Sequence, residues 1–219
     1  GLYKRICFVT GEPYSLEREL NWRSQLIKDY GIGANEELFC IPFAGGAGKV
    51  FNKNWFELVD FVPLGGIEAR FWDMAATAKE LNSKACYTAG VKIKKIGEIF
   101  YVSDFKADQL DPSAGDNLII NTAIADGRMT KVRWELEGGS AGLKVEANLQ
   151  RRLKGFDAKG VRPMGDKLTR AKPFASACLA GNVKILRSRW NEQYLNWLHN
   201  VDGSSGQGKV TDAADASSG

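Results

Sequence analysis

A single carboxylate inside an apolar stretch limits what this chain can fold into more than any other feature. The stretch RFWDMAAT (residues 70–77) is typical of a buried strand, and Asp73 lies within it. An ionised side chain in such a strand is costly unless a cation or a hydrogen-bond donor compensates it. The alternative is an Asp that caps a helix or turn directly after the strand. Two further acidic clusters later in the chain favour the first interpretation.

The side chains on which many hydrolases and metal sites depend are scarce. His199 is the only histidine, so neither a Ser-His-Asp triad nor a zinc site of His and Cys is expected. The four cysteines are scattered without a CxxC pair, which is typical of reduced, buried thiols in a cytosolic protein. No apolar run approaches the ~20 residues of a membrane span, so no membrane partner is expected. Any catalysis must therefore use carboxylates.

Basic residues are concentrated in one part of the chain. Residues 140–200 contain twelve Lys and Arg against four Asp and Glu, although the formal net charge of the whole chain is only +4. Such asymmetry indicates either a polyanionic partner such as nucleic acid or a set of solvated helix faces. Composition alone leaves both alternatives open.

The first sixty residues differ in character from the rest. Residues 14–30 have helical spacing, with Ser15 as the candidate N-cap. The loop at residues 43–49 (FAGGAGK) resembles a phosphate-binding P-loop, but Phe43 replaces its first Gly and Val50 replaces the Ser or Thr that binds magnesium. We interpret this loop as a flexible connection and expect no ATP hydrolysis.

From Gly65 onward the pattern changes to a regular order of strands and helices. The expected strands are residues 67–75, 87–96, 99–105, 131–137, 160–164 and 183–186. The expected helices are residues 112–125, a segment from about 142 to 155, 167–180 and 190–199, and after a Gly/Ser-rich loop at 202–209 a final Ala/Asp helix. Three antiparallel strands followed by alternating helices and parallel strands predict an α/β fold. Its layout is that of a ribonuclease H-like mixed central sheet flanked by helices.

In that layout the first strand, the end of the fourth strand and a late helix converge on one edge of the sheet. Asp73 lies on the first strand, Glu135 and Glu137 share a face of the fourth, and Asp212 and Asp215 share a helix face. Carboxylates this close cannot all ionise unless cations neutralise them, and oxygen-only ligation favours Mg²⁺ or Mn²⁺. Two such ions ~4 Å apart can activate water on a phosphodiester without a histidine base.

Six short motifs occur in a fixed order along the chain. They are RFWDMAAT (70–77), YTAGV (87–91), ELEGGSAG (135–142), GDKLTRAKP (165–173), GNVKIL (181–186) and TDAADASSG (211–219). Together they resemble the C-terminal nuclease domain of phage large terminase subunits, the packaging motors that cut concatemeric double-stranded DNA. The resemblance covers residues 62–219.

The resemblance implies a role for each candidate carboxylate. Asp73, Glu135, Asp212 and Asp215 would be the catalytic ligands of two Mg²⁺ or Mn²⁺ ions. Glu137 is the alternative to Glu135, or a supporting acid beside it.

The chain departs from the family pattern at two places. The family usually has an acid just before the Tyr-Thr pair, where this chain has Cys86. Its last motif often reads His-Asp-Asp, whereas Thr211 leaves a single Asp here before Asp215. Either Asp212 or Asp215 can therefore be the ligand of the second ion.

Several basic and aromatic residues also acquire an expected role. Lys167 and Arg170 would line the DNA groove beside the metals, or else belong to a solvated face paired with Asp166. Arg70 would either contact phosphate or lie at the edge of the core. The tryptophans that we expect in the core are Trp72, Trp134 and Trp190.

The resemblance finally implies a domain organisation and a set of partners. Residues 1–61 would be a connector and the remnant of an upstream ATPase domain, and residues 62–219 the nuclease domain. The partners would be double-stranded DNA, the ATPase domain, the small terminase subunit and the portal protein, in the cytoplasm of the phage-infected or prophage-carrying bacterium. The alternatives are a junction resolvase or transposase-type nuclease of the same fold, and a DNA-gripping module of the motor.

Overall fold

The computed structural model describes residues 21–22, 25, 50–74, 87–163, 165, 167–201 and 212–219. Its strands are β1 (Glu57–Val59), β2 (Ile67–Asp73), β3 (Thr88–Ile96), β4 (Ile99–Asp108), β5 (Lys131–Glu135), β6 (Ala158–Val161) and β7 (Val183–Leu186). Its helices are the short 3-10 turn η1 (Lys53–Trp55), then α3 (Pro112–Asp126), α4 (Gly139–Arg152), α5 (Lys167–Leu179), α6 (Asn191–His199) and α7 (Asp212–Ser218). The strands form one sheet in the order β1-β7-β4-β3-β2-β5-β6.

The topology of the sheet confirms the predicted fold class. Strands β2, β3 and β4 form an antiparallel meander, while β5 lies parallel to β2 and β6 lies parallel to β5. Strand β7 joins the other side of the meander, parallel to β4. This mixed sheet of three antiparallel strands with parallel additions is ribonuclease H-like.

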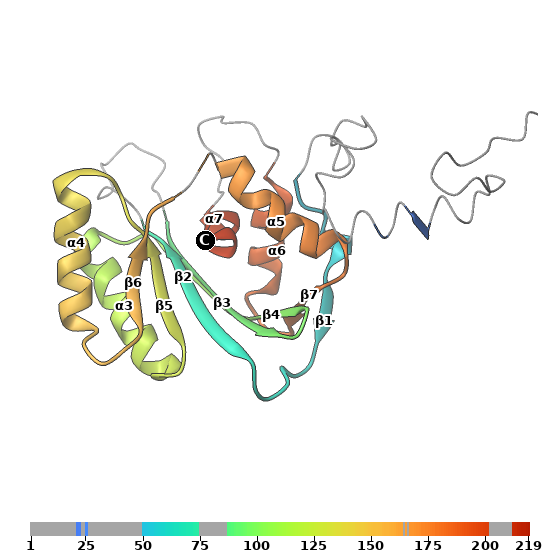
Figure 1. The fold of residues 1–219 in the computed structure, drawn as a ribbon, viewed down its shortest axis with the longest axis horizontal. Helices are drawn as coiled ribbons and strands as arrows, with labels where there is room; N and C mark the ends of the chain where they lie inside the picture. The colour runs from blue at the N-terminus through green and yellow to red at the C-terminus, as the bar shows by residue number, and fades with distance from the viewer. Residues whose placement is uncertain are drawn as a thin grey trace, which may run out of the picture.

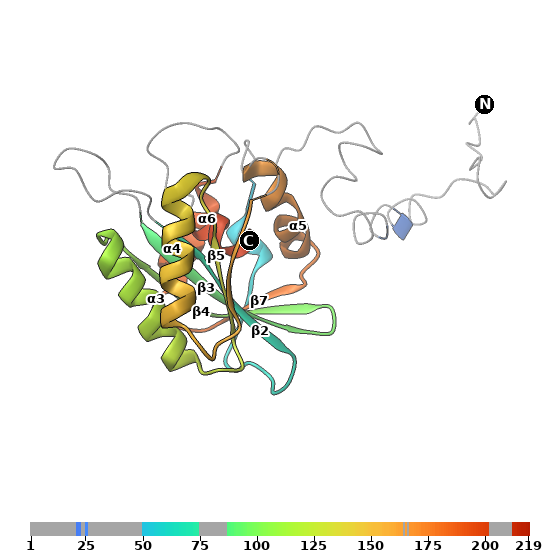
Figure 2. The same cartoon turned by 60° about the vertical axis from the view of Figure 1, so that its left-hand side comes forward.

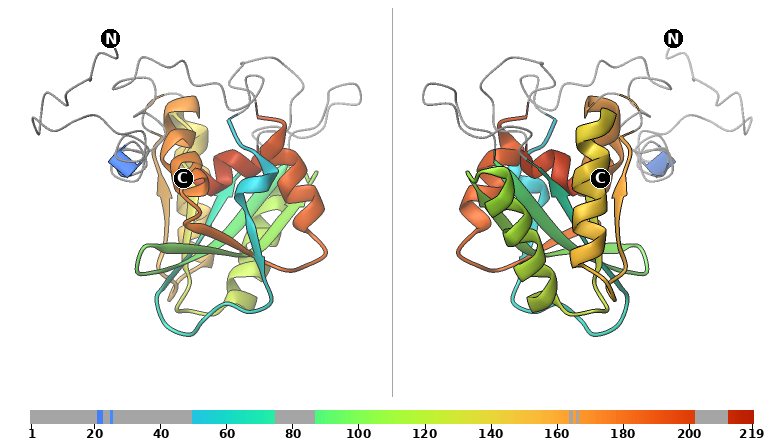
Figure 3. Two further views of the ribbon diagram at one scale, coloured as in Figure 1. Left: turned by 90° about the vertical axis from the view of Figure 1, so that its right-hand side faces the viewer. Right: turned by 90° about the vertical axis from the view of Figure 1, so that its left-hand side faces the viewer.

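Helices cover both faces of the sheet. Figure 1 shows α3 and α4 on one side and α5, α6 and α7 on the other, and the turned views agree (Figure 2, Figure 3). Helix α7 packs directly on β2 and β3, with α5 and α6 against it. Residues near the end of the chain can therefore place functional groups on the face of the sheet that carries α7.

The two faces are held by separate apolar clusters. Trp72 and Trp134 are register partners on β2 and β5, and both are fully buried against α3 and α4. Trp190 packs at the margin of the second cluster, edge-on to Tyr194. Gly90 lies opposite Trp72, and a Cβ added there would approach the indole to 2.4 Å. The middle of the YTAGV motif therefore leaves room for Trp72.

Local sequence signals account for several element boundaries. Asp111 caps α3 by accepting hydrogen bonds from the backbone N–H groups of Ser113 and Ala114, both at 3.0 Å. Pro112 occupies the first turn, and Gly127 ends the helix at a positive φ of 83°. Gly97, with φ of 57°, closes the β3–β4 hairpin as predicted.

Four strands differ from the prediction by two residues or more, and one of them, β4, extends to Asp108, three residues past its expected end. Strand β2 ends at Asp73 rather than at residue 75, and β5 ends at Glu135 rather than at Glu137. Beyond Glu135 the chain turns into α4, where the Glu137 carbonyl leaves no room for a Cβ on Gly142. Strand β6 begins earlier than expected and ends at Val161, since its register with β5 runs out there and Pro163 cannot extend a ladder.

A short additional strand, β1, pairs with β7. Val50 and Phe51, just before it, are buried in the core cluster beneath α5 and α6. These residues lie on the connector side of the predicted boundary at residues 61 and 62, yet they pack on the nuclease sheet. The boundary itself stays a prediction.

Some expectations fall on residues outside the described part of the chain. These are the loop at 43–49, Cys86, Asp166, the loop at 202–209, Thr211 and most of the helix at 14–30, of which Asn21, Trp22 and Gln25 are described as helical. Among the described helices, none has the length and apolar character needed to cross a bilayer.

Candidate active site

The ends of two neighbouring strands place two acids side by side. Asp73 is the last residue of β2 and Glu135 the last of β5, and these strands run parallel with Trp72 opposite Trp134. Because side chains alternate along a strand, Asp73 and Glu135 point away from the tryptophan pair and toward the α7 face. The two predicted ligands therefore share one end of the sheet.

Helix α7 brings the other two predicted ligands to the same end. Its residues Ala213, Ala214 and Ala216 are buried, and such small side chains let the helix approach the sheet closely. The Tyr194 hydroxyl on α6 lies 2.8 Å from the Ser217 hydroxyl, which also donates to the Ala213 carbonyl at 2.6 Å. Sequence reasoning missed this anchor, although the run of small residues in α7 is a signal for close packing.

The electrostatics of Asp73 show that the four acids form one cluster. Burial raises the pKa of Asp73 well above its usual range, and the charges of Asp215, Asp212 and Glu135 raise it further. Lys167 opposes these effects. Because each of the other three carboxylates acts on Asp73, the topology brings all four predicted ligands together.

Asp212 has a similar environment. Burial, with the charge of Asp215, raises the pKa of Asp212 to about 6, against the lowering effects of a backbone hydrogen bond and of Lys167. The folded protein therefore disfavours the charged form of this carboxyl group. A cation placed among these groups would relieve that cost.

Two cations on α5 contact the acids directly. The Lys167 Nζ donates to Asp215 Oδ2 at 2.7 Å, and the Arg170 Nη1 donates to Glu135 Oε2 at 2.6 Å. The Arg170 Nη2 also lies 4.0 Å from Asp215 Oδ1. Burial alone would lower the pKa of Lys167, but the hydrogen bond and charge of Asp215, together with the charges of Asp73 and Asp212, outweigh it and raise the pKa.

The donor set fits a hard divalent cation, because every candidate ligand is a carboxylate oxygen. Among the described residues, however, no group of three acidic, His or Cys side chains has the arrangement needed to hold a metal ion. Lys167 and Arg170 contact Asp215 and Glu135 instead. The acids are gathered, and side-chain cations partly neutralise them.

Glu135 and Glu137 occupy different environments. Glu135 is partly buried and bonded to Arg170, whereas Glu137 lies beyond the end of β5 and is exposed. The arrangement thus places Glu135 within the cluster. The choice of ligand between the two remains a proposal.

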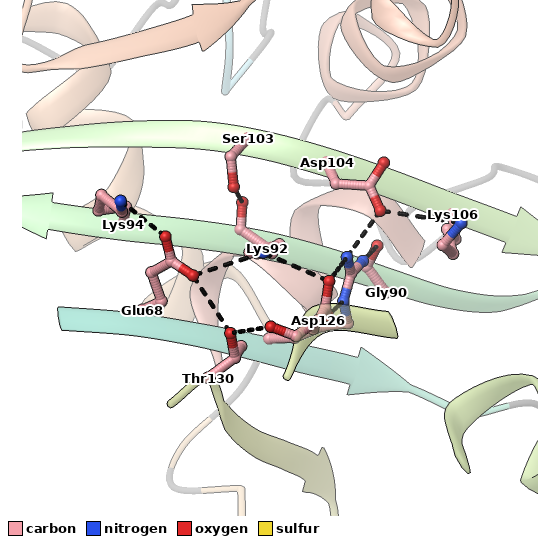
Figure 4. Close-up of polar contacts among 10 residues, drawn as sticks. Glu68, Gly90, Lys92, Lys94, Ser103, Asp104, Lys106, Asp126 and Thr130 are labelled. Atoms are coloured by element: carbon pink, nitrogen blue, oxygen red, sulfur yellow. Dashed lines mark hydrogen bonds and ion pairs between the residues drawn. The ribbon is translucent and has the colours of Figure 1, made fainter. Parts of the chain in front are cut away.

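Arg70, three residues before Asp73, lies on the opposite face of the sheet. Its side chain is only 1% exposed, and its guanidinium donates to Asp126 and to Asp104, both at 2.6 Å, and to the Gly90 carbonyl at 3.3 Å. Figure 4 shows these acceptors, with Lys92 bridging from Asp126 toward Glu68. Of the two roles considered for Arg70, the structure supports the core edge rather than a phosphate contact.

Comparison with known proteins places this arrangement in a family. A family model described as the terminase RNaseH-like domain matches residues 70–218. The probable terminase large subunit gp28 of Escherichia phage Mu is 46% identical over 48 residues, which are 21% of this chain and 9% of gp28. The matched segment is therefore a small part of that relative.

Two solved structures share the fold. The large terminase nuclease of thermophilic phage G20c has a TM-score of 0.50 at 13% identity, covering 77% of this chain and 96% of that one. The large terminase of a second thermophilic bacteriophage has a TM-score of 0.52 at 12% identity, covering 76% of this chain and 42% of that one. Since the family model spans well over half of the sequence, from β2 to α7, the chain belongs to the terminase family as a nuclease domain of ribonuclease H-like fold.

Proposed function

We propose that this domain is a divalent-metal-dependent endonuclease that hydrolyses phosphodiester bonds in concatemeric double-stranded DNA. The observation that carries the proposal is the convergence of Asp73, Glu135, Asp212 and Asp215 from β2, β5 and α7 on one end of the sheet. Four carboxylates with mutually unfavourable charges are expensive to gather in a fold. Cations bound at this site would neutralise the gathered charges and so offset that cost.

Asp73 is the central ligand of the proposed site. The other three carboxylates all act on it electrostatically, so it is the residue best placed to contact both of two Mg²⁺ or Mn²⁺ ions. Glu135 would complete one side, with Glu137 as its alternative, and Asp212 and Asp215 the other. Such ions supply an activated water and stabilise the leaving oxygen, which removes the need for a histidine base.

Lys167 and Arg170 are proposed to border the DNA groove beside the acids, with Lys167 as the residue that contacts the backbone. The Lys167 side chain is 63% exposed at the margin of the cluster, within reach of a phosphate backbone. Contacts to phosphates carry no sequence information directly. We therefore expect cleavage with little sequence preference.

The proposed setting is the terminase large subunit of a packaging motor. In that setting residues 1–61 would join the nuclease to an ATPase domain, and the small terminase subunit and portal protein would be further partners. The motor would act in the cytoplasm of the bacterial host. Family membership supports this setting. The chain itself is expected to hydrolyse no ATP, because Phe43 replaces the first Gly of a P-loop and Val50 replaces its Ser or Thr.

A plasmid assay tests the proposal. Supercoiled plasmid incubated with the chain and Mn²⁺ or Mg²⁺ should yield nicked and linear products. Excess EDTA should abolish these products, and Asp73→Asn should slow their formation by about 100-fold or more. Asp60→Asn is the matched control. Asp60 is exposed and directly follows the outer strand β1, and among the contacts described for it the ion pair is with Arg187. Full cleavage in EDTA would refute the metal-dependent mechanism.

The same assay separates the rival functions. Retarded plasmid migration without products at any metal concentration would indicate a DNA-gripping module. Cleavage of a four-way junction but not of linear duplex would indicate a resolvase-type nuclease. Nicking of ordinary duplex DNA by the parent chain, but not by Asp73→Asn, supports the terminase endonuclease.

A further inference from the structure

The two α5 cations that contact the carboxylates differ in their freedom to move. We propose that Lys167 is an exchangeable counter-ion, which a divalent metal must displace from Asp215, whereas Arg170 is a fixed bridge between Glu135 and Asp215. This inference rests on the proposed function, since it concerns how the same site accepts its metal. It assigns Lys167 two successive partners, first a carboxylate and then the DNA backbone.

Lys167 has the features of a replaceable cation. Its Nζ lies 2.7 Å from Asp215 Oδ2, and the Asp215 side chain is only 7% exposed, whereas that of Lys167 is 63% exposed. A buried carboxylate needs a cation nearby, but this ammonium group sits on a flexible stem that already lies largely in water. Withdrawing it therefore exposes little new surface.

Arg170 has the opposite character. Its side chain is 14% exposed, and its planar guanidinium spans from Glu135 at 2.6 Å to Asp215 at 4.0 Å. It thereby links the end of β5 to α7. A rigid, buried fork of this kind holds its partners in position, and moving it would leave two acids without their shared cation.

A metal ion and the Lys167 ammonium compete for the same oxygen. Mg²⁺ binds carboxylate oxygens at about 2.1 Å, so an ion on Asp215 Oδ2 and an ammonium 2.7 Å from that atom would repel each other at close range. Metal entry therefore drives Lys167 outward. The released ammonium becomes available to a phosphate, so that metal binding should strengthen DNA binding.

Titration calorimetry with Mn²⁺ tests the exchange without relying on cleavage. Lys167→Gln should bind Mn²⁺ about two- to fivefold more tightly than the parent, the range expected for losing one partly exposed ion pair. Arg170→Gln should bind it more weakly because the acids lose their bridge. Lys184→Gln is the matched control, since Lys184 forms one comparable pair with Glu57 at 3.0 Å at the far edge of the sheet.

A second readout uses Ca²⁺ and a short duplex DNA. Ca²⁺ should raise the DNA affinity of the parent several-fold and should raise that of Lys167→Gln by less. A purely structural role of Lys167 would weaken metal binding instead, so the sign of the change in Mn²⁺ affinity discriminates. Unchanged or weaker Mn²⁺ binding by folded Lys167→Gln overturns the exchange.

Two further measurements keep the result decisive. If Lys167→Gln does not fold, the parent is titrated with Mg²⁺ and the ¹³Cε signal of Lys167 is followed by NMR. This signal is assigned by its loss in Lys167→Arg. A signal that does not shift overturns the exchange. If the parent cuts DNA and binds Mn²⁺ but Lys167→Gln matches it, only this inference fails. If the parent binds no divalent ion, the proposed function fails with it.

Discussion

At the scale of single residues, Asp73 should matter most for activity. It lies at the end of β2, where the charges of Asp215, Asp212 and Glu135 all act on it. Asp73→Asn should lower the rate of plasmid nicking by about 100-fold or more, as the loss of a metal ligand shared by two ions implies. Initial rates at saturating Mn²⁺ measure the effect, with circular dichroism to verify folding. A folded variant that cuts at the parental rate would remove Asp73 from the site.

The two glutamates near the end of β5 should not be equivalent. Glu135 is bonded to Arg170 inside the cluster, whereas Glu137 is exposed beyond the strand. Glu135→Gln should therefore reduce the nicking rate more than Glu137→Gln does, by about tenfold or more. The same rate assay on both variants decides, and the reverse order would exchange their roles.

The raised pKa of Asp212 predicts how stability depends on pH. Because the pKa is about 6 in the folded state and about 3.9 in the unfolded state, the unfolded chain releases its proton first as pH rises. This group therefore contributes full stability below about pH 4, and the metal-free protein loses it progressively up to about pH 6.

Asp212→Asn should remove that pH dependence. In EDTA, the free energy of unfolding of the variant should increase by about 1 kcal/mol relative to that of the parent between pH 4 and pH 7. This is less than the full pKa shift implies, because the carboxyl is partly exposed to solvent. Urea unfolding at both pH values measures it. Asp73 shifts in the same direction, so the difference between variant and parent is the quantity to compare. A constant difference across the range would contradict the assignment.

At the scale of elements, Arg70 should tie α3 to the sheet. Arg70→Met leaves the carboxylates of Asp126, 11% exposed, and Asp104, 31% exposed, without the guanidinium that bridges them. Breaking a buried pair in this way costs about 3–5 kcal/mol, and the partial exposure of Asp104 favours the lower end. Arg187→Met, which breaks the exposed pair with Asp60, should cost less than about 1 kcal/mol. Urea unfolding of both variants gives the comparison.

Most elements could be predicted because their boundaries depend on local signals. The cap and proline at Asp111 and Pro112 begin α3, and Gly97 closes a hairpin whose strands alternate in polarity. Strand β1 could not be predicted, since three residues carry no periodicity and its pairing with β7 is distant in sequence. The end of β5 likewise depends on the turn toward α4 rather than on strand propensity.

At the scale of the whole molecule, the topology accounts for the part of the site that the sequence could predict. Once three antiparallel strands and a parallel fourth are assumed, Asp73 must lie beside the end of the fourth strand, and the observed register places Glu135 rather than Glu137 next to it. The contacts of Lys167 and Arg170 could not be predicted in this way, because helical spacing does not reveal whether a cation faces solvent or a carboxylate. The pairing is a product of how α5 and α7 pack together, which is tertiary information.

The last prediction concerns the stability of the whole domain. Divalent ions that bind only the folded state stabilise it by mass action, by about 2.7 kcal/mol for each ion present at a hundred times its Kd. For a domain of this size each kcal/mol raises Tm by roughly 2–4 °C. Millimolar Mn²⁺ should therefore raise Tm of the parent by about 5 °C or more, and Asp73→Asn should lose most of the increase.

Asp212→Asn and Asp215→Asn should each lose less of it, because the two acids lie on one helix and each can partly replace the other. A thermal-shift titration of the four proteins against Mn²⁺ provides the measurement, with Ca²⁺ as the non-catalytic control. The ranking follows from the electrostatics of the cluster, since the charges of the other three acids all raise the pKa of Asp73. An equal increase in all four proteins would mean that the ions bind elsewhere, and the carboxylate cluster would then lose its claim to be the active site.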